Sequence, residues 1–404
     1  MSVLYITPPS VECYVGTVKV PVGCVGPLRV RMDDAPRADL EELLDKTYLV
    51  PMATTEGVLL ASYNRGAKAM TQSGGAWASV TSRQMVRAPA FSFANVRAAA
   101  AFLKWFRSPS SGVAGAIRVA VEAQPHCRLV RLEAAITDRS VHVHVGIDSD
   151  DAAGQNMVTY CGRVVMTEVA ARHRPADESM RVVSALIEGG FNAGKRGSVG
   201  VHLMQGKGHH ATVDCLLPAA VVRSVLRTTP AEVVRLQRLH SKTASFIGTL
   251  GSTAHAANGL AAFYIANGQD PACVAESHAA VTSFEVAEDG GLYASMTLPS
   301  LIVSTIGGGT RLPSQGACLD VIGARHSNEL AGVLAATVLA GEISFYSAIV
   351  AGQFDGEFII TCVPLSRFTR HYIPNWIQQH SSRYPLPPRS GALERDAQGG
   401  DVSD

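Results

Sequence analysis

The sequence predicts an α+β fold in which a small domain is inserted into a larger domain built around a long central helix. Apolar residues make up 47% of the 404 residues and charged residues 17%, a profile typical of a chain with a large packed core. Residues 330–352 form a long run of small and apolar side chains that carries one charge, Glu342, and this run predicts a buried helix. Between residues 88 and 187, strand and helix patterns follow the order β-α-β-β-α-β of ferredoxin-like domains.

Charge and cysteine content exclude several classes of protein. Lys and Arg number 35 and Asp and Glu 34, a net charge of +1, so we expect no attraction to nucleic acid or to an anionic membrane. The eight cysteines are spread along the chain without a CxxC pair, which argues against a disulfide framework or a zinc site. No signal peptide is visible at the start. These features favour a cytoplasmic protein with free thiols, no bound metal and no membrane anchor.

The first part of the large domain is expected to contain two helices. Residues 40–46 predict a short acidic helix, and a centrally packed helix should follow Thr54 or Thr55, either of which can cap it. Glu56 lies between these threonines and a glycine, and no other charge occurs from residue 50 until Arg65. A carboxylate in such surroundings caps a helix, pairs with a cation or takes part in chemistry, and the stretch alone leaves these alternatives open.

The inserted domain is predicted element by element. A strand at residues 90–94 precedes a helix capped by Asn95, and two alternating runs around residues 126–149 form a hairpin that turns at residues 138–140. A helix over residues 154–172 and a strand over residues 180–187 complete the domain. The predicted division is a large domain at residues 1–87 and 188–379, the insert at residues 88–187, and a disordered tail at residues 380–404, where Pro, Gly and charge accumulate.

Three stretches could carry a site, although each also has an ordinary structural interpretation. The loop "DDAAGQNM" (residues 150–157) opens a helix whose first N–H groups could hold a phosphate, as well as being a common strand–helix junction. The basic, glycine-rich loop "GGFNAGKRGSVG" (residues 189–200) lies at the domain boundary, where ligand clefts form. His255 and Asn258, three residues apart on an apolar helix, are either core residues or part of a site.

Taken together, the motifs resemble the catalytic domain of the 3-hydroxy-3-methylglutaryl-CoA reductases. They are "VGTVKVPVGCVGPL", "PMATTEG", "NRGAKAM", "MVRAP", "DAAGQNM", "AHAAN", "GQDPA", "TIGGGTRLPSQGACLD" and "ATVLAGEISFYSAIVAGQ", in the family's order. The resemblance implies that the ferredoxin-like insert binds NADP(H), and that the protein forms a dimer, or a tetramer, with shared active sites. It also implies reduction of a thioester to an alcohol with two NADPH, through a hemithioacetal and an aldehyde.

The resemblance assigns roles to individual residues. Glu56 matches the catalytic glutamate that donates a proton, Lys195 the lysine that stabilises the oxyanion, and Asp270 the aspartate that tunes the other two. The positions that match the family's cofactor loop are Asp151, Ala152, Gly154, Gln155, Asn156 and Met157. The positions expected around the substrate are Arg87, Arg196, Lys242, His255 and Asn258.

The chain departs from the family pattern at the leaving group. Phe358 stands where the family has the histidine that protonates the departing thiolate, so we expect thioester cleavage to suffer before hydride transfer does.

A second group of departures lies in the substrate loop. The pattern S-G-N-x-x-x-D-K-K-P becomes "EGGFNAGKRG", in which Glu188 replaces the serine, Gly194 the aspartate, Arg196 the second lysine and Gly197 the proline. If Glu188 faces the pocket, it should repel a substrate carboxylate.

These observations lead to three hypotheses. The leading one is an NADPH-dependent oxidoreductase, with NADH as the alternative cofactor, that acts on an acyl-CoA or related thioester or on the derived aldehyde. The second is a carbonyl or aldehyde reductase that transfers a single hydride to a different substrate. The third, from another class, is a non-catalytic paralogue that binds a ligand.

Overall fold

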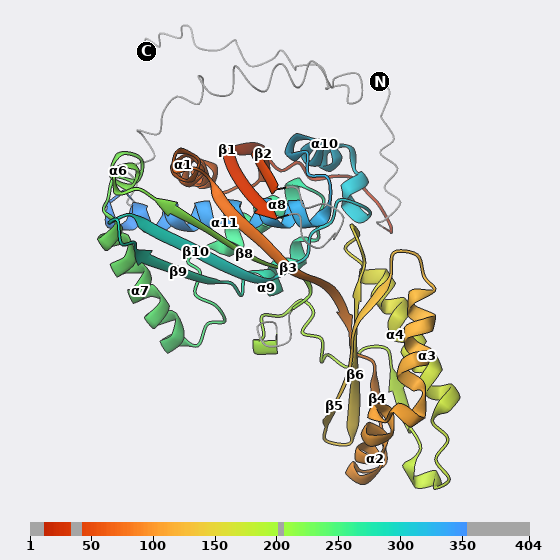
Figure 1. Cartoon of the computed structure of the whole chain (residues 1–404). Helices are drawn as coiled ribbons and strands as arrows, with labels where there is room; N and C mark the ends of the chain where they lie inside the picture. The colour runs from red at the N-terminus through yellow and green to blue at the C-terminus, as the bar shows by residue number, and fades with distance from the viewer. Residues whose placement is uncertain (1–11, 34–42, 201–205, 354–404) are drawn as a thin grey trace, which may run out of the picture. The chain divides into compact units, whose positions relative to one another are not determined.

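The computed structural model describes residues 12–33, 43–200 and 206–353, and it has the predicted mixture of helices and strands. In these residues ten strands form one continuous sheet, which β3 (Ala76–Arg87) joins together. Most of β3 pairs with β8 (Gly208–Leu217), whereas its last three residues pair with β6 (Ser140–Asp148), both antiparallel. Figure 1 shows β3 passing from one part of the sheet into the other. The described residues belong to one compact unit by their internal contacts, so the domain boundaries at residues 87 and 187 stay predictions.

The first part of the sheet contains strands of the predicted large domain. Its order is β3-β8-β10-β9, and β1, which pairs in parallel with β3, forms an antiparallel pair with β2. The strands not yet defined are β1 (Val22–Asp33), β2 (Leu43–Ala53), β9 (Val281–Val286) and β10 (Leu292–Leu301). The helix predicted at residues 40–46 is wrong for residues 43–46, which lie in β2. Leu44, Tyr48, Val50 and Met52 are buried, whereas Asp45 and Thr47 are exposed, and this strand-like alternation, together with pairing to β1, outweighs local helix propensity.

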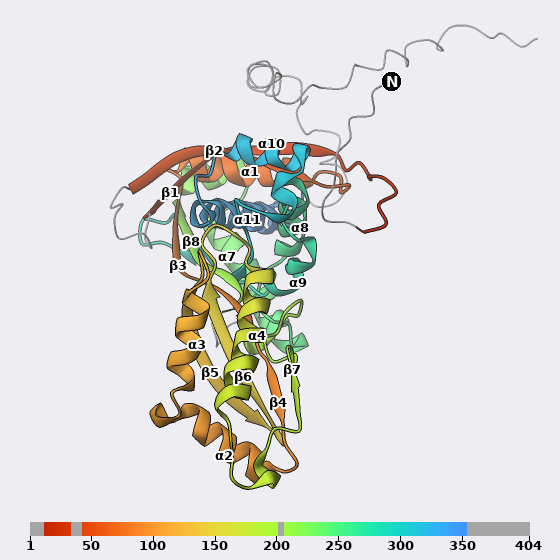
Figure 2. The same cartoon turned by 90° about the vertical axis from the view of Figure 1, so that its right-hand side faces the viewer.

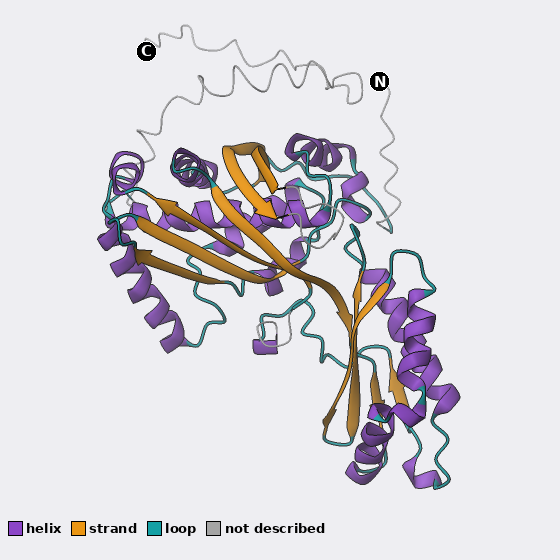
Figure 3. Ribbon diagram, viewed as in Figure 1, coloured by secondary structure: helices purple, strands orange, loops and turns teal. Residues whose placement is uncertain are grey.

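Helices α1, α7 and α8 pack against α11. Figure 3 shows the helices in purple and the strands in orange. The longest, α11, is buried along almost its whole length and contacts α1, α7, α8 and strands β3, β8 and β10. Length and composition alone would let it cross a membrane, but 83% of its most apolar window is buried, as expected for a core helix. The helices of this part are α1 (Leu59–Gln72), α6 (Ala219–Val221), α7 (Pro230–Ile247), α8 (Ala256–Ala266), α9 (Val274–Ser277), α10 (Pro313–Ile322) and α11 (Ser327–Val350), with a π-helical turn at Val222–Leu226 and 3-10 turns at Pro271–Cys273 and Gly308–Arg311.

Glycines allow α1, α8 and α11 to approach closely. A side chain at Gly66 on α1 would overlap the backbone carbonyl of Ala340 on α11. The ring of Tyr63 is fully buried, and side chains at Gly259 or Gly341 would overlap it. The expected cap at Thr54 or Thr55 is wrong, because α1 begins at Leu59 after a left-handed Val58. The Thr54 hydroxyl instead accepts the N–H of Glu56, three residues before the helix.

The remaining elements follow the predicted order β-α-β-β-α-β, with one extra helix, α3. They are β4 (Ala90–Ser92), α2 (Val96–Arg107), α3 (Val113–Glu122), β5 (Arg128–Thr137), β6, α4 (Gln155–Arg172) and β7 (Ser184–Leu186), with 3-10 turns at Pro109–Ser111 and Glu178–Met180. Strands pair antiparallel in the order β7-β4-β6-β5, and α2, α3 and α4 pack on them (Figure 2). The predicted cap of α2 is confirmed, because the Asn95 side chain accepts the N–H of Ala98 at 2.9 Å. The last strand is shorter than predicted.

Candidate active site

Lys195 and Asp270, 75 residues apart in sequence, form an ion pair through Lys195 Nζ. Lys195 lies in the loop between β7 and β8. Asp270 lies after α8, where its carboxylate also accepts the N–H of Ala272 at 3.0 Å and caps the Pro271–Cys273 turn. Nζ makes a second contact with Cys273 Sγ, at 3.1 Å. The structure therefore brings together two of the three residues predicted to carry the chemistry.

Both members of this pair are charged at neutral pH. Burial works against the charge of Lys195, but its hydrogen bonds to Asp270 and Cys273 outweigh burial and raise its pKa. Burial likewise works against the Asp270 carboxylate, but the bond from Lys195 outweighs it and lowers the pKa. The two side chains are 42% and 52% exposed, so a ligand can reach the ammonium.

A buried carboxylate fixes the backbone of Lys195. The residue has φ of +58°, a left-handed conformation that is strained for a side chain other than glycine. Its N–H donates to Glu276 Oε2 at 2.5 Å, and Glu276, on α9, is only 1% exposed. Burial raises the pKa of Glu276. The strained conformation of Lys195 is therefore held by a group that sequence analysis did not identify.

Glu56 is not joined to this pair. It is exposed in the loop between β2 and α1, and in the described part of the chain it makes no hydrogen bond or ion pair with Lys195 or Asp270. Burial lowers the pKa of His255, and the charge of Glu56 opposes this only in part. His255 lies at the N-cap of α8, not within the helix, and its Nε2 contacts the carbonyl of Gly341 at 3.0 Å.

Arg87 already has internal partners. Its guanidinium pairs with Glu188 at 3.3 Å and donates to the Thr159 hydroxyl at 2.7 Å. Glu188 in turn accepts the N–H of Gly190 at 2.7 Å and the side-chain amide of Asn192. The arginine that was predicted to face the substrate is thus already paired with Glu188.

The three other predicted substrate residues show no polar side-chain contact within the described ranges. Arg196 follows Lys195 in its loop, Lys242 lies on α7, and Asn258 lies in the first turn of α8, all exposed. Among the described residues their side chains make no hydrogen bond or ion pair. Phe358, the strongest departure from the family pattern, falls outside the described residues.

The predicted cofactor loop has the geometry of a phosphate cradle. Gly154 has φ of +74° at the N-cap of α4, and a side chain there would overlap that of Ser149. No side chain of the described residues caps this helix, so among them the N–H groups of its first turn, which includes Gln155, Asn156 and Met157, have no side-chain acceptor at the N-cap. Asn156 is exposed, whereas Met157 packs partly into the core. These residues fit a dinucleotide phosphate.

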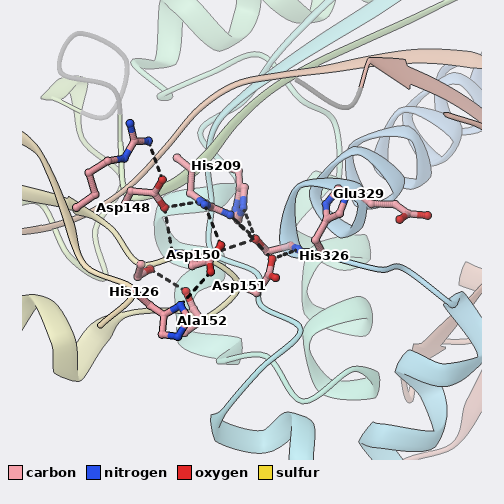
Figure 4. A network of polar contacts seen from close by, with 12 residues as sticks. His126, Asp148, Asp150, Asp151, Ala152, His209, His326 and Glu329 are labelled. Carbon is pink, nitrogen blue, oxygen red and sulfur yellow. Dashed lines mark hydrogen bonds and ion pairs between the residues drawn. The ribbon is translucent and has the colours of Figure 1, made fainter. Parts of the chain in front are cut away.

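An ionic network anchors this loop to α11 (Figure 4). Arg83 pairs with Asp148 at 2.7 Å and lies 3.6 Å from Asp150 and 4.0 Å from Asp151. The Asp151 carboxylate accepts the N–H of Ser327, the first residue of α11, at 2.8 Å, where a negative charge suits the helix dipole.

The same loop has a second attachment and a buried neighbour. Ala152 forms a parallel bridge with Ile306. His209 is buried beside Ser327, and burial lowers its pKa to about 4, so it is neutral.

Several groups that support the site were not predicted from the sequence. Arg83, Cys273 and Glu276 stand in stretches without a local signal. Their relevance arises from contacts between segments far apart in sequence. In the described ranges, no group of three or more His, Cys, Asp or Glu side chains could hold a metal ion.

Comparison with known proteins identifies relatives over most of the chain. A family model described as hydroxymethylglutaryl-coenzyme A reductase matches residues 5–356. The 3-hydroxy-3-methylglutaryl-coenzyme A reductase 2 of Capsicum annuum is 37% identical over 354 residues, which are 85% of this chain and 55% of that protein. The reductase 1 of Dictyostelium discoideum is 35% identical over 357 residues, 85% of this chain and 60% of that protein. The chain thus spans somewhat more than half the length of these relatives.

A solved structure shares the fold. The class II 3-hydroxy-3-methylglutaryl-CoA reductase of Streptococcus pneumoniae, bound to NADPH in open conformations, matches with a TM-score of 0.64 and 19% identity. The match covers 84% of this chain and 87% of that one. At this level of identity the similarity establishes the α+β fold.

Proposed function

Because this chain belongs to the hydroxymethylglutaryl-coenzyme A reductase family, we propose that it is an NADPH-dependent reductase that transfers hydride to an acyl-CoA thioester or to the derived aldehyde. The observation that carries the proposal is the exposed ion pair between Lys195 and Asp270. We further propose a cytoplasmic homodimer or tetramer with shared active sites, in which residues 88–187 act as a ferredoxin-like cofactor domain.

Gly154 and the first turn of α4 would hold the phosphates of the dinucleotide, which supplies a hydride when bound. NADPH is the cofactor bound by the pneumococcal relative, and NADH remains the alternative. Asp151 and Arg83 would keep the cradle in place through their contacts with α11 and the loop. This role needs no movement of the loop, because the Asp151 carboxylate already accepts the Ser327 N–H and Ala152 already pairs with Ile306.

The reacting carbonyl would lie against Lys195 Nζ. An ammonium fixed in this position stabilises the oxyanion that forms when hydride arrives, and Asp270 keeps the ammonium protonated and oriented. Glu56, exposed in a separate loop beside His255, is the proposed proton donor to that oxyanion. His255 and Asn258 would border the substrate near the start of α8.

The test is to mix the purified protein with NADPH and a panel of acyl-CoA thioesters and aldehydes. We expect oxidation of NADPH by at least one compound, and a loss of about 10²–10³ in rate for Lys195→Met with NADPH affinity unchanged. Absence of oxidation together with absence of NADPH binding would refute the proposal. A ligand-binding paralogue without catalysis would bind the panel and leave NADPH unreacted.

A second candidate, a single-hydride carbonyl or aldehyde reductase, is favoured by Phe358 at the position of the family's thiolate-protonating histidine. The NADPH consumed per product distinguishes the two. One NADPH per alcohol from an aldehyde, with thioesters unreactive, supports the single-hydride enzyme. Two NADPH per alcohol from a thioester contradicts it.

A further inference from the structure

Glu276, which holds the backbone of Lys195, has one carboxylate oxygen to spare. Its Oε2 accepts the Lys195 N–H, whereas its Oε1 is buried and has no hydrogen-bond partner among the described residues. A buried carboxylate in this state is costly to ionise unless a cation lies nearby. A charged acceptor also binds an N–H more strongly than a neutral one does. The support of Lys195 therefore depends on what stabilises the charge of Glu276.

Lys207 is the cation that acts most strongly on Glu276. It precedes β8 and is only 5% exposed. Among the charges that act on Glu276, that of Lys207 has the largest effect, and the reverse also holds. No hydrogen bond or ion pair joins the two side chains in the described ranges. They attract each other through space, and such attraction is screened much less in the interior than in water.

The loop that carries Lys195 lies against both members of this charge pair. A side chain at Gly194 would overlap Nζ of Lys207, so the ammonium packs directly against the loop backbone. The next residue, Lys195, donates its N–H to Glu276. The sheet fixes Lys207 from below, because its carbonyl accepts the Ser300 hydroxyl on β10 at 2.7 Å.

This loop needs support because its backbone is strained. Ala193 and Lys195 both have left-handed φ values, +55° and +58°, although neither is a glycine. Such conformations persist where the surroundings hold them in place. The place of the Lys195 ammonium beside Asp270 depends on this backbone.

We propose that Lys207 is a positioning residue, which keeps Glu276 ionised and thereby holds the loop that presents Lys195 to the substrate. The inference rests on the proposed function, in which the Lys195 ammonium stabilises an oxyanion. Lys207 itself binds no ligand in this role.

The direction of the pH effect follows from the charges around Glu276. Burial raises its pKa, the charges of Lys207 and Lys195 and the Lys195 N–H lower it, and the charge of Asp270 raises it. Without Lys207 the pKa of Glu276 should rise further, so the carboxylate should take up a proton at a higher pH. The other titratable groups that act on this charge pair are Arg87, Glu188, Tyr264 and Cys273.

Hydrogen–deuterium exchange of the Lys195 amide measures the positioning without turnover. It is followed by mass spectrometry from pH 5 to pH 8 and corrected for the intrinsic exchange rate. Protection of this amide should be lost as the pH falls and Glu276 takes up a proton. Lys207→Met should move this loss upward by about one pH unit or more, as expected for removal of a nearby opposite charge. Lys207→Arg keeps the charge and should restore the wild-type behaviour.

Matched variants separate this role from general destabilisation. Lys46→Met removes a lysine from another buried carboxylate, Glu329, which binds the Arg325 N–H, and it should leave the Lys195 amide unchanged. Glu276→Gln should reduce the protection at every pH and abolish its pH dependence, and added Lys207→Met should change nothing further. If Lys207→Met fails to fold, Lys207→Gln and Glu276→Gln still test the inference.

Turnover supplies the second measurement. In Lys207→Met, the acid side of the pH profile of kcat for NADPH oxidation should move upward as the amide protection does, with NADPH affinity within about two-fold of wild type. A loss of packing alone would lower kcat at every pH without moving the profile.

Three results would overturn the inference: wild-type protection in the Lys207 variants, an equal shift in Lys46→Met, or a pH dependence that survives in Glu276→Gln. The expected exchange pattern without NADPH oxidation by any thioester or aldehyde would instead refute the proposed reductase activity and leave the hold of Lys207 on the loop intact.

Discussion

Replacement of Glu342 by glutamine should change how the stability of the protein depends on pH. Glu342 lies on α11 and is fully buried. Its two oxygens accept the N–H groups of Ala254 (2.7 Å) and His255 (2.8 Å), which fixes the start of α8 against α11. Burial raises its pKa to about 7, although the two N–H bonds and nearby His240 oppose this.

The size of the effect follows from the pKa. The ordinary value is 4.5, so between pH 4.5 and about 7 the folded protein holds a proton that the unfolded chain has released. The stabilisation from this proton is fully present below pH 4.5 and is lost as the pH rises through 7. At about 1.4 kcal/mol per pKa unit, the loss amounts to about 3 kcal/mol. Glutamine does not titrate, so Glu342→Gln should lack this component.

Equilibrium urea unfolding of both proteins from pH 5 to pH 8 tests the prediction. The difference in free energy of unfolding, wild type minus variant, should fall by about 2–3 kcal/mol over this range. Glu329→Gln is the matched control on the same helix. Glu329 is also fully buried, but bonds from the Arg325 N–H, Lys46 and Tyr48 outweigh burial and lower its pKa. Its contribution is lost only as the pH falls through the carboxylate range, so its difference should stay flat from pH 5 to 8.

A difference for Glu342→Gln that does not change with pH would refute the reasoning, because it would mean that the folded protein holds Glu342 ionised throughout. The groups that face this carboxylate from other elements are Tyr63 on α1, His240 on α7 and His255 at the start of α8. A pH effect in both variants would point to one of the histidines.

Three other substitutions have definite expected outcomes. Gly66→Ala should lower the free energy of unfolding by about 3 kcal/mol or more, because the added methyl group meets the α11 backbone. The control is Gly115→Ala on α3, which has open space around it and should leave the thermal stability unchanged or raise it. Gly154→Ala should weaken NADPH binding at least about 10-fold in a fluorescence titration, because the alanine would need a left-handed backbone and its methyl group would overlap Ser149. An unchanged affinity would exclude this loop as the phosphate-binding site. Glu188→Ser should free Arg87 from its ion pair and lower the Kd of 3-hydroxy-3-methylglutaryl-CoA about 3–10-fold, as measured by calorimetry. An unchanged Kd would mean that Arg87 cannot reach the ligand.

Sequence patterns predicted the fold where local signals and packing agree. The Asn95 cap, the turn between β5 and β6 and the buried α11 each follow from residues within a short window. The prediction failed at residues 43–46, where acidic residues suggested a helix but pairing with β1 produced a strand. It also placed the start of α1 too early, since Thr54 caps a turn around Glu56 and the helix follows a left-handed Val58. Short side chains that cap turns as readily as helices make this boundary ambiguous.

The site was predicted only in part for a different reason. Lys195, Asp270 and Gly154 stand in motifs that can be recognised in the chain. Glu276 accepts the Lys195 N–H, and Lys207 packs against Gly194 in the same loop. No residue near Glu276 or Lys207 in the sequence indicates these contacts. The partner of Glu188 required the structure as well, because nothing in the sequence indicates its ion pair with Arg87.

Buried or partly buried carboxylates that accept backbone N–H groups hold several segments in place. Glu276 binds the N–H of Lys195, Glu342 those at the start of α8, Asp151 that of Ser327, and Glu329 that of Arg325. A charged acceptor makes a stronger bond to an N–H than a neutral one does, and a buried N–H without an acceptor is costly. These bonds hold the left-handed backbone of Lys195 and the start of α8 in place. It follows that Glu276→Gln, which replaces the charged acceptor of the Lys195 N–H with a neutral amide oxygen, should impair hydride transfer more than it impairs NADPH binding.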